Sequence, residues 1–142
     1  MKVSIIDLIG NELSKLFPNI PIYRENQKGG FKEPSFFVEK IITNVNPELF
    51  DIQSRSYSYQ LVYFPKLDEP KTDIEIVEEI LLDNFTQLTD YAVIRNRDFK
   101  QSDDNTLLLT FNIQIRAHKI DVSAKQQNMK FKGKITDERD VY

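Results

Sequence analysis

The chain has 142 residues, of which 40% are hydrophobic and 29% charged; its formal net charge is −3, and it contains no cysteine. This length predicts one domain with one core. The lack of cysteine excludes disulfides, Cys-zinc sites and thiol nucleophiles, and the small negative charge provides no field that would recruit nucleic acid. No stretch is apolar enough for a signal peptide or a membrane span, so we expect a protein of the reducing cytoplasm, or of an assembly made there.

The first third of the sequence predicts one helix followed by two strands. Apolar side chains recur every three or four residues over 3–17, which is the spacing of an amphipathic helix, and Pro18 ends it. The β-branched and aromatic run at 20–25 is typical of a brief strand, and "SFFVEKII" at 35–42 is typical of a longer one. A flexible loop is expected between the two strands.

This loop enters the second strand through the sequence "GGFKEP", which we interpret as a turn. Gly29 and Gly30 accept backbone angles that other residues avoid, and Pro34 disfavours the helical region for Glu33. Phe31 is expected to be exposed. A phosphate-binding loop is disfavoured, because no GK[ST] follows and the next element is a strand rather than a helix N-terminus.

A turn-rich loop is expected over 44–50, before a long strand over 51–65. Apolar and polar residues alternate in this strand, with the period of two expected when one face is buried, while Val62 and Phe64 indicate that its far end is covered on both faces. The inner face consists of Tyr57, Tyr59, Leu61 and Tyr63. We interpret these residues as core rather than as a recognition stripe, because the alternation already accounts for them.

The remaining elements complete an α+β domain. Thr72 and Glu75 match a capping box, which predicts a second amphipathic helix behind them. Strands are predicted over 90–100 and 106–118, and the turn 101–105 separates them. The predicted order is α-β-β-β-α-β-β, an antiparallel or mixed sheet of about four to five strands with two helices packed on one face.

The composition changes after His118, so we expect a domain over 1–118 and a polar C-terminal extension over 119–142. The extension contains too little apolar surface to offset the entropy of ordering it alone, so it is either disordered or ordered by a partner. Lysines interleave with Met129 and Phe131, which is a faint signal for nucleic acid or a membrane. The acidic end of the extension and the negative net charge weaken that signal, and docking on a protein is favoured.

Catalytic candidates are few and do not form a recognisable set. His118 is the only histidine, and the sequence supplies no orienting partner for it as a catalytic base. Asp103 and Asp104 fit a turn, and the ligand spacing of a calcium loop is missing. We therefore expect a binding or assembly module rather than an enzyme, with no cofactor and no metal.

Two stretches of the sequence resemble a known family. They are "IPIYRENQKGGFKEPSFFV" and "RSYSYQLVYFPK", and both are similar to sequences in the small tail terminator proteins of long-tailed phages, prophages and phage-derived bacteriocins of Gram-positive bacteria. The matching positions are Tyr23, Glu25, Gly30, Phe31, Lys32, Glu33, Pro34, Phe36, Phe37, Tyr59, Tyr63, Phe64, Pro65 and Lys66. The similarity covers residues 1–118 and is specific at "GFKEP", although the loop is longer than in the family by Lys28 and Gly29.

The resemblance implies a non-enzymatic structural protein of the virion tail, or of a phage-tail-like particle, made in the bacterial cytoplasm. Family members assemble as homo-hexameric rings on the last ring of the tail tube protein. They stop tube growth and face the head-side connector, and in contractile systems they also meet the sheath end. No membrane partner is implied, and nucleic acid would only pass through the ring lumen.

Under this resemblance, two parts of the chain are candidates for subunit interfaces. The first is the loop segment Gly29, Gly30, Phe31, Lys32, Glu33 and Pro34. Lys32 and Glu33 would pair across subunits. The second is the C-terminal extension, with Met129 and Phe131. Two alternatives stay open: a head–tail joining protein acting one layer higher and, more remotely, a small enzyme or nucleotide-binding domain.

Overall fold

The structure, a computed structural model, describes residues 4–118, and the interface candidates Met129 and Phe131 lie outside this range. The predicted order of helices and main strands is present. The elements are α1 (Ile5–Leu16), β1 (Ile22–Tyr23), β2 (Ser35–Pro47), the 3₁₀ turn η1 (Leu49–Asp51), β3 (Ile52–Phe64), α2 (Pro70–Asn84), β4 (Gln87–Leu88), β5 (Ala92–Gln101) and β6 (Leu107–His118).

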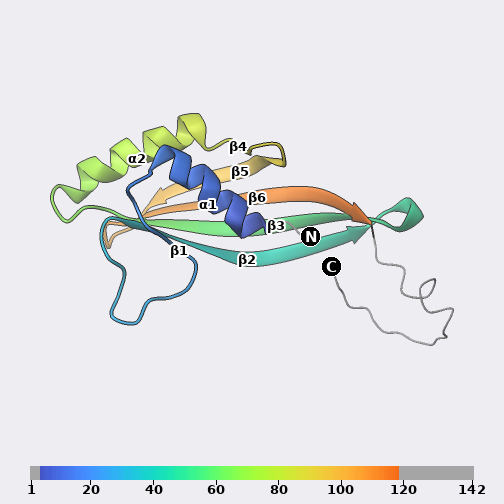
Figure 1. The fold of residues 1–142 in the computed structure, drawn as a ribbon, viewed down its shortest axis with the longest axis horizontal. Helices are drawn as coiled ribbons and strands as arrows, with labels where there is room; N and C mark the ends of the chain where they lie inside the picture. Colours follow the sequence, from blue (N-terminus) through green and yellow to red (C-terminus); the bar gives the residue numbers. More distant parts are fainter. Residues whose placement is uncertain (1–3, 119–142) are drawn as a thin grey trace. The chain divides into compact units, whose positions relative to one another are not determined.

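The strands form one six-stranded sheet in the order β1-β2-β3-β6-β5-β4 (Figure 1). β1 runs parallel to β2, whereas β5 runs antiparallel to both β4 and β6, so the sheet is mixed. Together with the two helices, it makes the α+β architecture predicted from the sequence. The prediction did not include β4, because a two-residue strand has no period that a sequence pattern can reveal.

By its internal contacts the described chain divides into two units. The larger comprises residues 4–44 and 56–115, and the smaller comprises residues 45–55 and 116–118. The larger unit contains both helices and the apolar core.

Both helices cover the same face of the sheet and bury one core against it (Figure 1). The predicted inner face of β3 belongs to this core, since Tyr59 and Tyr63 are only 3% and 1% exposed. The ring centroids of Tyr63 and Phe36 lie 4.9 Å apart, and those of Tyr59 and Phe111 lie 5.8 Å apart. Aromatic contacts therefore join neighbouring strands beneath the helices. The core residues from the helices and their ends are Ile9, Leu13, Phe17, Ile74, Val77, Leu81 and Phe85.

β2 is longer than predicted, and the loop expected over 44–50 is short. The strand continues to Pro47, and η1 alone separates it from β3. β-Branched residues recur after Lys40 and favour extended backbone, which explains this length. Every residue of β2 from Lys40 onward is exposed, so no alternation of buried and exposed positions marks this part of the strand in the sequence.

α2 begins before the predicted capping box, and that prediction is wrong. The first helical residue is Pro70, which has no N–H to leave unpaired, and the preceding Glu69 (φ +52°) makes no side-chain capping bond. Asp73 instead accepts hydrogen bonds from Tyr63 Oη at 2.6 Å and from Lys66 N at 3.0 Å. These bonds join the end of β3 to α2. Burial, with the bond to Asp73, raises the pKa of Tyr63.

A bulge in β5 places an arginine against the end of α2. The pairing with β6 shifts between Arg95 and Asp98, and Asn96 has a left-handed backbone (φ +54°). Such a bulge turns the following side chain toward the other face. Arg97 Nη1 donates to three carbonyl oxygens at 3.0 to 3.2 Å, those of Leu81, Leu82 and Phe85. The last carbonyls of a helix lack partners within it, so this cation caps α2 and complements its dipole.

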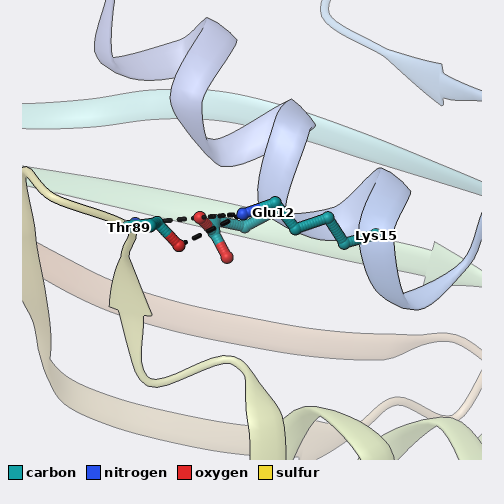
Figure 2. Close-up of polar contacts among 3 residues, drawn as sticks. All are labelled: Glu12, Lys15 and Thr89. Atoms are coloured by element: carbon teal, nitrogen blue, oxygen red, sulfur yellow. Dashed lines mark hydrogen bonds and ion pairs between the residues drawn. The ribbon is translucent and has the colours of Figure 1, made fainter.

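Glu12 of α1 joins that helix to the segment after β4 (Figure 2). Its Oε2 accepts hydrogen bonds from Thr89 N at 2.8 Å and from Lys15 Nζ at 3.2 Å. Lys15 Nζ also donates to Thr89 Oγ1 at 3.2 Å. Burial by itself would raise the pKa of Glu12, but the hydrogen bonds from Thr89 and Lys15 outweigh it and lower the pKa.

Replacing Glu12 by Gln is expected to reduce the dependence of stability on pH. The folded protein holds the Glu12 pKa below its ordinary value of 4.5, so the carboxylate stabilises the fold above that pH. This stabilisation is lost as the pH falls through the folded value. The melting temperature of Glu12→Gln should therefore be below that of the parent protein at neutral pH and approach it as the pH falls through the lowered pKa of Glu12.

Glu79→Gln is the matched control, because Glu79 is exposed on α2. Its melting temperature should follow the parent protein across the same pH range. Parallel curves for Glu12→Gln and the parent protein would contradict the role assigned to Glu12.

Candidate functional site

Residues 24–34, which we call the 24–34 loop, connect β1 to β2 on the face of the sheet opposite the helices (Figure 1). The ring of Phe31 anchors this loop. Its centroid lies 4.6 Å from that of Phe64, 5.0 Å from that of Phe37 and 5.6 Å from that of Tyr23. Phe31 is therefore half-buried, and the expectation that it is exposed is wrong.

The position of Phe31 follows from the alternation of side chains in β2 and β3. Phe36 and Tyr63 point into the core beneath the helices, so their neighbours Phe37 and Phe64 point to the other face. Within the described chain no helix covers that face, and contact with Phe31 removes aromatic surface from water. The sequence signal is the pair of adjacent aromatic residues in each strand, "FF" in β2 and "YF" in β3. One member of each pair must lie on the helix-free face, where another aromatic ring can cover it.

The two glycines of the loop adopt the backbone that the sequence predicts. Gly29 has φ +82° and Gly30 has φ +91°, a region that side chains with a Cβ rarely occupy. Gly30 N donates to the carbonyl oxygen of Gln27 at 3.1 Å, and Gln27 Nε2 donates to the carbonyl oxygen of Glu25 at 2.9 Å. The loop is thus a hydrogen-bonded turn on an aromatic base.

Two adjacent charged residues of the loop are exposed to solvent, whereas Arg24 at its start pairs with Asp7. Lys32 and Glu33 are both exposed, next to the half-buried Phe31 and Pro34. Among residues 4–118 neither Lys32 nor Glu33 forms a hydrogen bond or an ion pair. Their charges are therefore available to another molecule.

A shallow hollow of about 260 Å³ adjoins the loop at one end of the sheet. Three connections meet there: the end of the 24–34 loop, the segment between β3 and α2, and the turn between β5 and β6. Its lining residues are Glu33, Phe64, Pro65, Lys66, Leu67, Pro70, Asp104, Asn105 and Thr106. The side chain of Leu67 is 81% exposed beside it, so this end of the sheet combines charge with an accessible apolar group.

The catalytic candidates named from the sequence lie before and at the end of β6. Asp104 lies in the turn before β6, where its Oδ1 accepts a hydrogen bond from Thr106 Oγ1 at 2.9 Å. Hydrogen bonds from Ser102 and Thr106 lower the pKa of Asp104. His118 is the last residue of β6, at the other end of that strand. Within residues 4–118 no group of three or more His, Cys, Asp or Glu side chains is placed to hold a metal ion.

Sequence reasoning missed a second set of accessible apolar residues, in and after β2. Ile41 and Ile42 are 46% and 51% exposed, and in η1 Leu49 and Phe50 are 76% and 87% exposed. The signal was present as "KII" and "ELF", apolar residues in segments with no partner face. Exposed apolar side chains that lie in a group mark interaction surfaces more often than exposed apolar side chains that are scattered singly.

A protein-family model described as "Phage tail terminator protein" matches residues 4–127. The chain belongs to the phage tail terminator family. The match includes both helices, the whole sheet and the 24–34 loop, so the resemblance carried by "GFKEP" is confirmed. The terminator is therefore a structural protein of the phage tail, located in the virion tail among other tail proteins.

A search of curated proteins found no match to the terminator. Among residues 4–118, neither helix is long and apolar enough to cross a membrane.

Replacing Phe31 by Ala should release the 24–34 loop of the terminator without unfolding the core. Loss of three ring contacts from a half-buried position is expected to cost about 2 kcal/mol of the free energy of unfolding. Urea unfolding measures this cost, and limited proteolysis should show faster cleavage within the loop. The control is Phe50→Ala, at an 87% exposed ring, which should cost less than about 0.5 kcal/mol. Equal costs for the two variants would contradict the anchoring role.

Proposed function

We propose that the terminator forms a homo-hexameric ring that caps the head-proximal end of the tail tube. The ring stops polymerisation of the tube protein and offers its other face to the head-side connector or, in a contractile tail, to the sheath end. The observation that carries this proposal is the family match over residues 4–127.

The structure supports a ring through the way its accessible groups are distributed. A head-to-tail interface joins two different patches of one subunit, and a ring closes when the rotation between subunits completes a circle. No described residue neutralises Lys32 or Glu33 of the 24–34 loop, and β2 offers apolar residues elsewhere on the subunit; each is a separate contact that a neighbouring subunit can make. A closed ring uses up its lateral contacts. Growth stops when the exposed face of the ring does not copy the docking surface of the tube.

The function is tested by electron microscopy of tails assembled with and without the terminator. Tails made with it should have one tube length, whereas tubes made without it should vary in length or continue to grow. Uniform tubes in both preparations would overturn the capping role. Uniform tubes that fail only to join heads would favour the alternative of a head–tail joining protein.

The role of the loop in the ring is tested by charge reversal. Lys32→Glu and Glu33→Lys should each place like charges across the subunit interface, weakening it by about 0.5 kcal/mol per contact at low salt. The double variant restores opposite charges and should recover much of the ring. Ring formation is followed by light scattering and by electron microscopy of capped tubes.

Arg95→Glu is the control for these variants, since Arg95 is exposed on β5, near the edge of the sheet opposite β1 and β2, which the loop connects. It changes the net charge as Lys32→Glu does and should leave the ring intact. Rings that tolerate Lys32→Glu and Glu33→Lys equally well at every salt concentration would exclude the proposed pairing.

A further inference from the structure

The outer edge of β2 is open along most of the larger unit. β1 pairs with β2 only at Phe36 and Phe37, and within residues 4–118 no other strand lies on that side of β2. The backbone from Val38 to Asn44 therefore presents unpaired N–H and C=O groups, and two of its side chains, Ile41 and Ile42, are about half exposed. An apolar open edge of this kind is a template for another strand.

The opposite edge of the sheet, formed by β4 and β5, is protected against the addition of a strand. β5 extends beyond its short partner β4, but it carries the bulge at Asn96. Its exposed positions there are also charged, at Arg95, Asp98 and Lys100. Bulges and charged edge residues are the usual means by which proteins block strand addition. No residue from Val38 to Asn44 has a left-handed backbone, and this stretch carries only two charges, at Glu39 and Lys40.

A hollow of about 200 Å³ adjoins the β2 edge on the side of the helices. Ile6 and Gly10 of α1, Ile22 of β1 and Val38 of β2 form its apolar part. Its polar lining includes the ion pair between Asp7 and Arg24. A Cβ placed on Gly10 would have no atom within 4 Å, so the space above this glycine is empty. A strand added beside Val38 would direct alternate side chains into this space.

The chain itself contains a segment with the pattern such a strand needs. Residues 129–135 read "MKFKGKI", in which Met129, Phe131 and Ile135 alternate with three lysines. The alternation is interrupted only at Gly133, and such a pattern is typical of a strand with one buried face. The segment lies outside the described residues.

We propose that residues 129–135 of one subunit pair with the Val38–Asn44 edge of the neighbouring subunit, an inference that rests on the proposed ring. Met129 and Phe131 enter the hollow beside Gly10, and the lysines lie on the helix-free face, where Glu39 of β2 is half-buried. The acceptor and the donor are equally long.

The geometry of a ring favours a second copy of the chain as the partner that pairs with the Val38–Asn44 edge. Each subunit has one donor segment and one acceptor edge, so each gives one strand and receives one, as a head-to-tail ring requires. Residues 119–128 connect His118 to the donor segment and span up to about 33 Å when extended. The added strand supplies backbone hydrogen bonds, and the hollow supplies the specificity.

The test uses the absence of cysteine from the chain. Thr43→Cys and Lys132→Cys are combined in one protein, tails are assembled with it, and a short bismaleimide is added. Denaturing gels should then show a ladder of covalent oligomers, because each subunit is linked to the next. The control is Val93→Cys with Lys132→Cys, since Val93 is 54% exposed on β5 at the other side of the sheet, and it should give no ladder.

Other occupants of the edge give different products. A crosslink confined to the monomer means that the segment folds back on its own subunit, and dimers from Thr43→Cys alone mean that two β2 edges pair with each other. Either result, or the absence of any crosslink, overturns the proposal.

A second variant fills the hollow. Gly10→Leu should leave the monomer as stable as the parent or more stable, because glycine weakens a helix and the space beside it is empty. It should reduce the Thr43–Lys132 crosslink yield about tenfold by competing for the space of the donor side chains. An unchanged crosslink yield would overturn the proposal that Met129 and Phe131 bind in the hollow beside Gly10.

The tube lengths measured in the same tails separate the two proposals. Tubes of one length without the Thr43–Lys132 ladder overturn strand exchange and leave the capping function standing. A complete ladder on tubes of uncontrolled length overturns the capping function and leaves strand exchange standing.

Discussion

The contact between Phe31 and Phe64 determines how the terminator presents its charged loop. Both helices lie on one face of the sheet, so the aromatic residues that alternate onto the other face have no helix to cover them. Phe31 covers Phe37 and Phe64 from within the 24–34 loop, and the glycines beside it allow the backbone to turn back. Lys32 and Glu33 follow the anchored ring directly, so packing of that ring positions them although neither forms a hydrogen bond or an ion pair in the described chain.

Much of the fold could be predicted from the sequence because its periodic segments are long. The alternation of tyrosines in β3 and of apolar residues in β6 identified the inner face of the sheet, and the spacing in α1 identified the helix that covers it. The motif "GFKEP" identified the family, which no periodicity could have done. The predicted boundary between a domain and a C-terminal extension stays a prediction, since residues 119–142 lie outside the described part.

The misses have physical causes that lie outside the local pattern. The bulge at Asn96 shifts the alternation of β5 by one residue, and only the pairing with β6 and the carbonyls of α2 explain why Arg97 turns inward. The capping box predicted at Thr72 and Glu75 does not form, because α2 already begins at Pro70. The fixed φ of proline suits the first position of a helix. Phe31 was expected in solvent because its partners are 6 and 33 residues away in the sequence, at Phe37 and Phe64.

The strand order of the sheet has a consequence for how a newly made chain folds. β6 is the last described strand in the sequence, yet it lies between β3 and β5. A growing chain that has been synthesised only as far as β5 can form the β2–β3 pair and the β4–β5 pair. No backbone hydrogen bonds join these two pairs until β6 is present between them. Docking of α1 waits as well, because Glu12 needs Thr89, far along the chain. Contacts of such long range fold slowly, so we expect the core to close only after β6 has been synthesised.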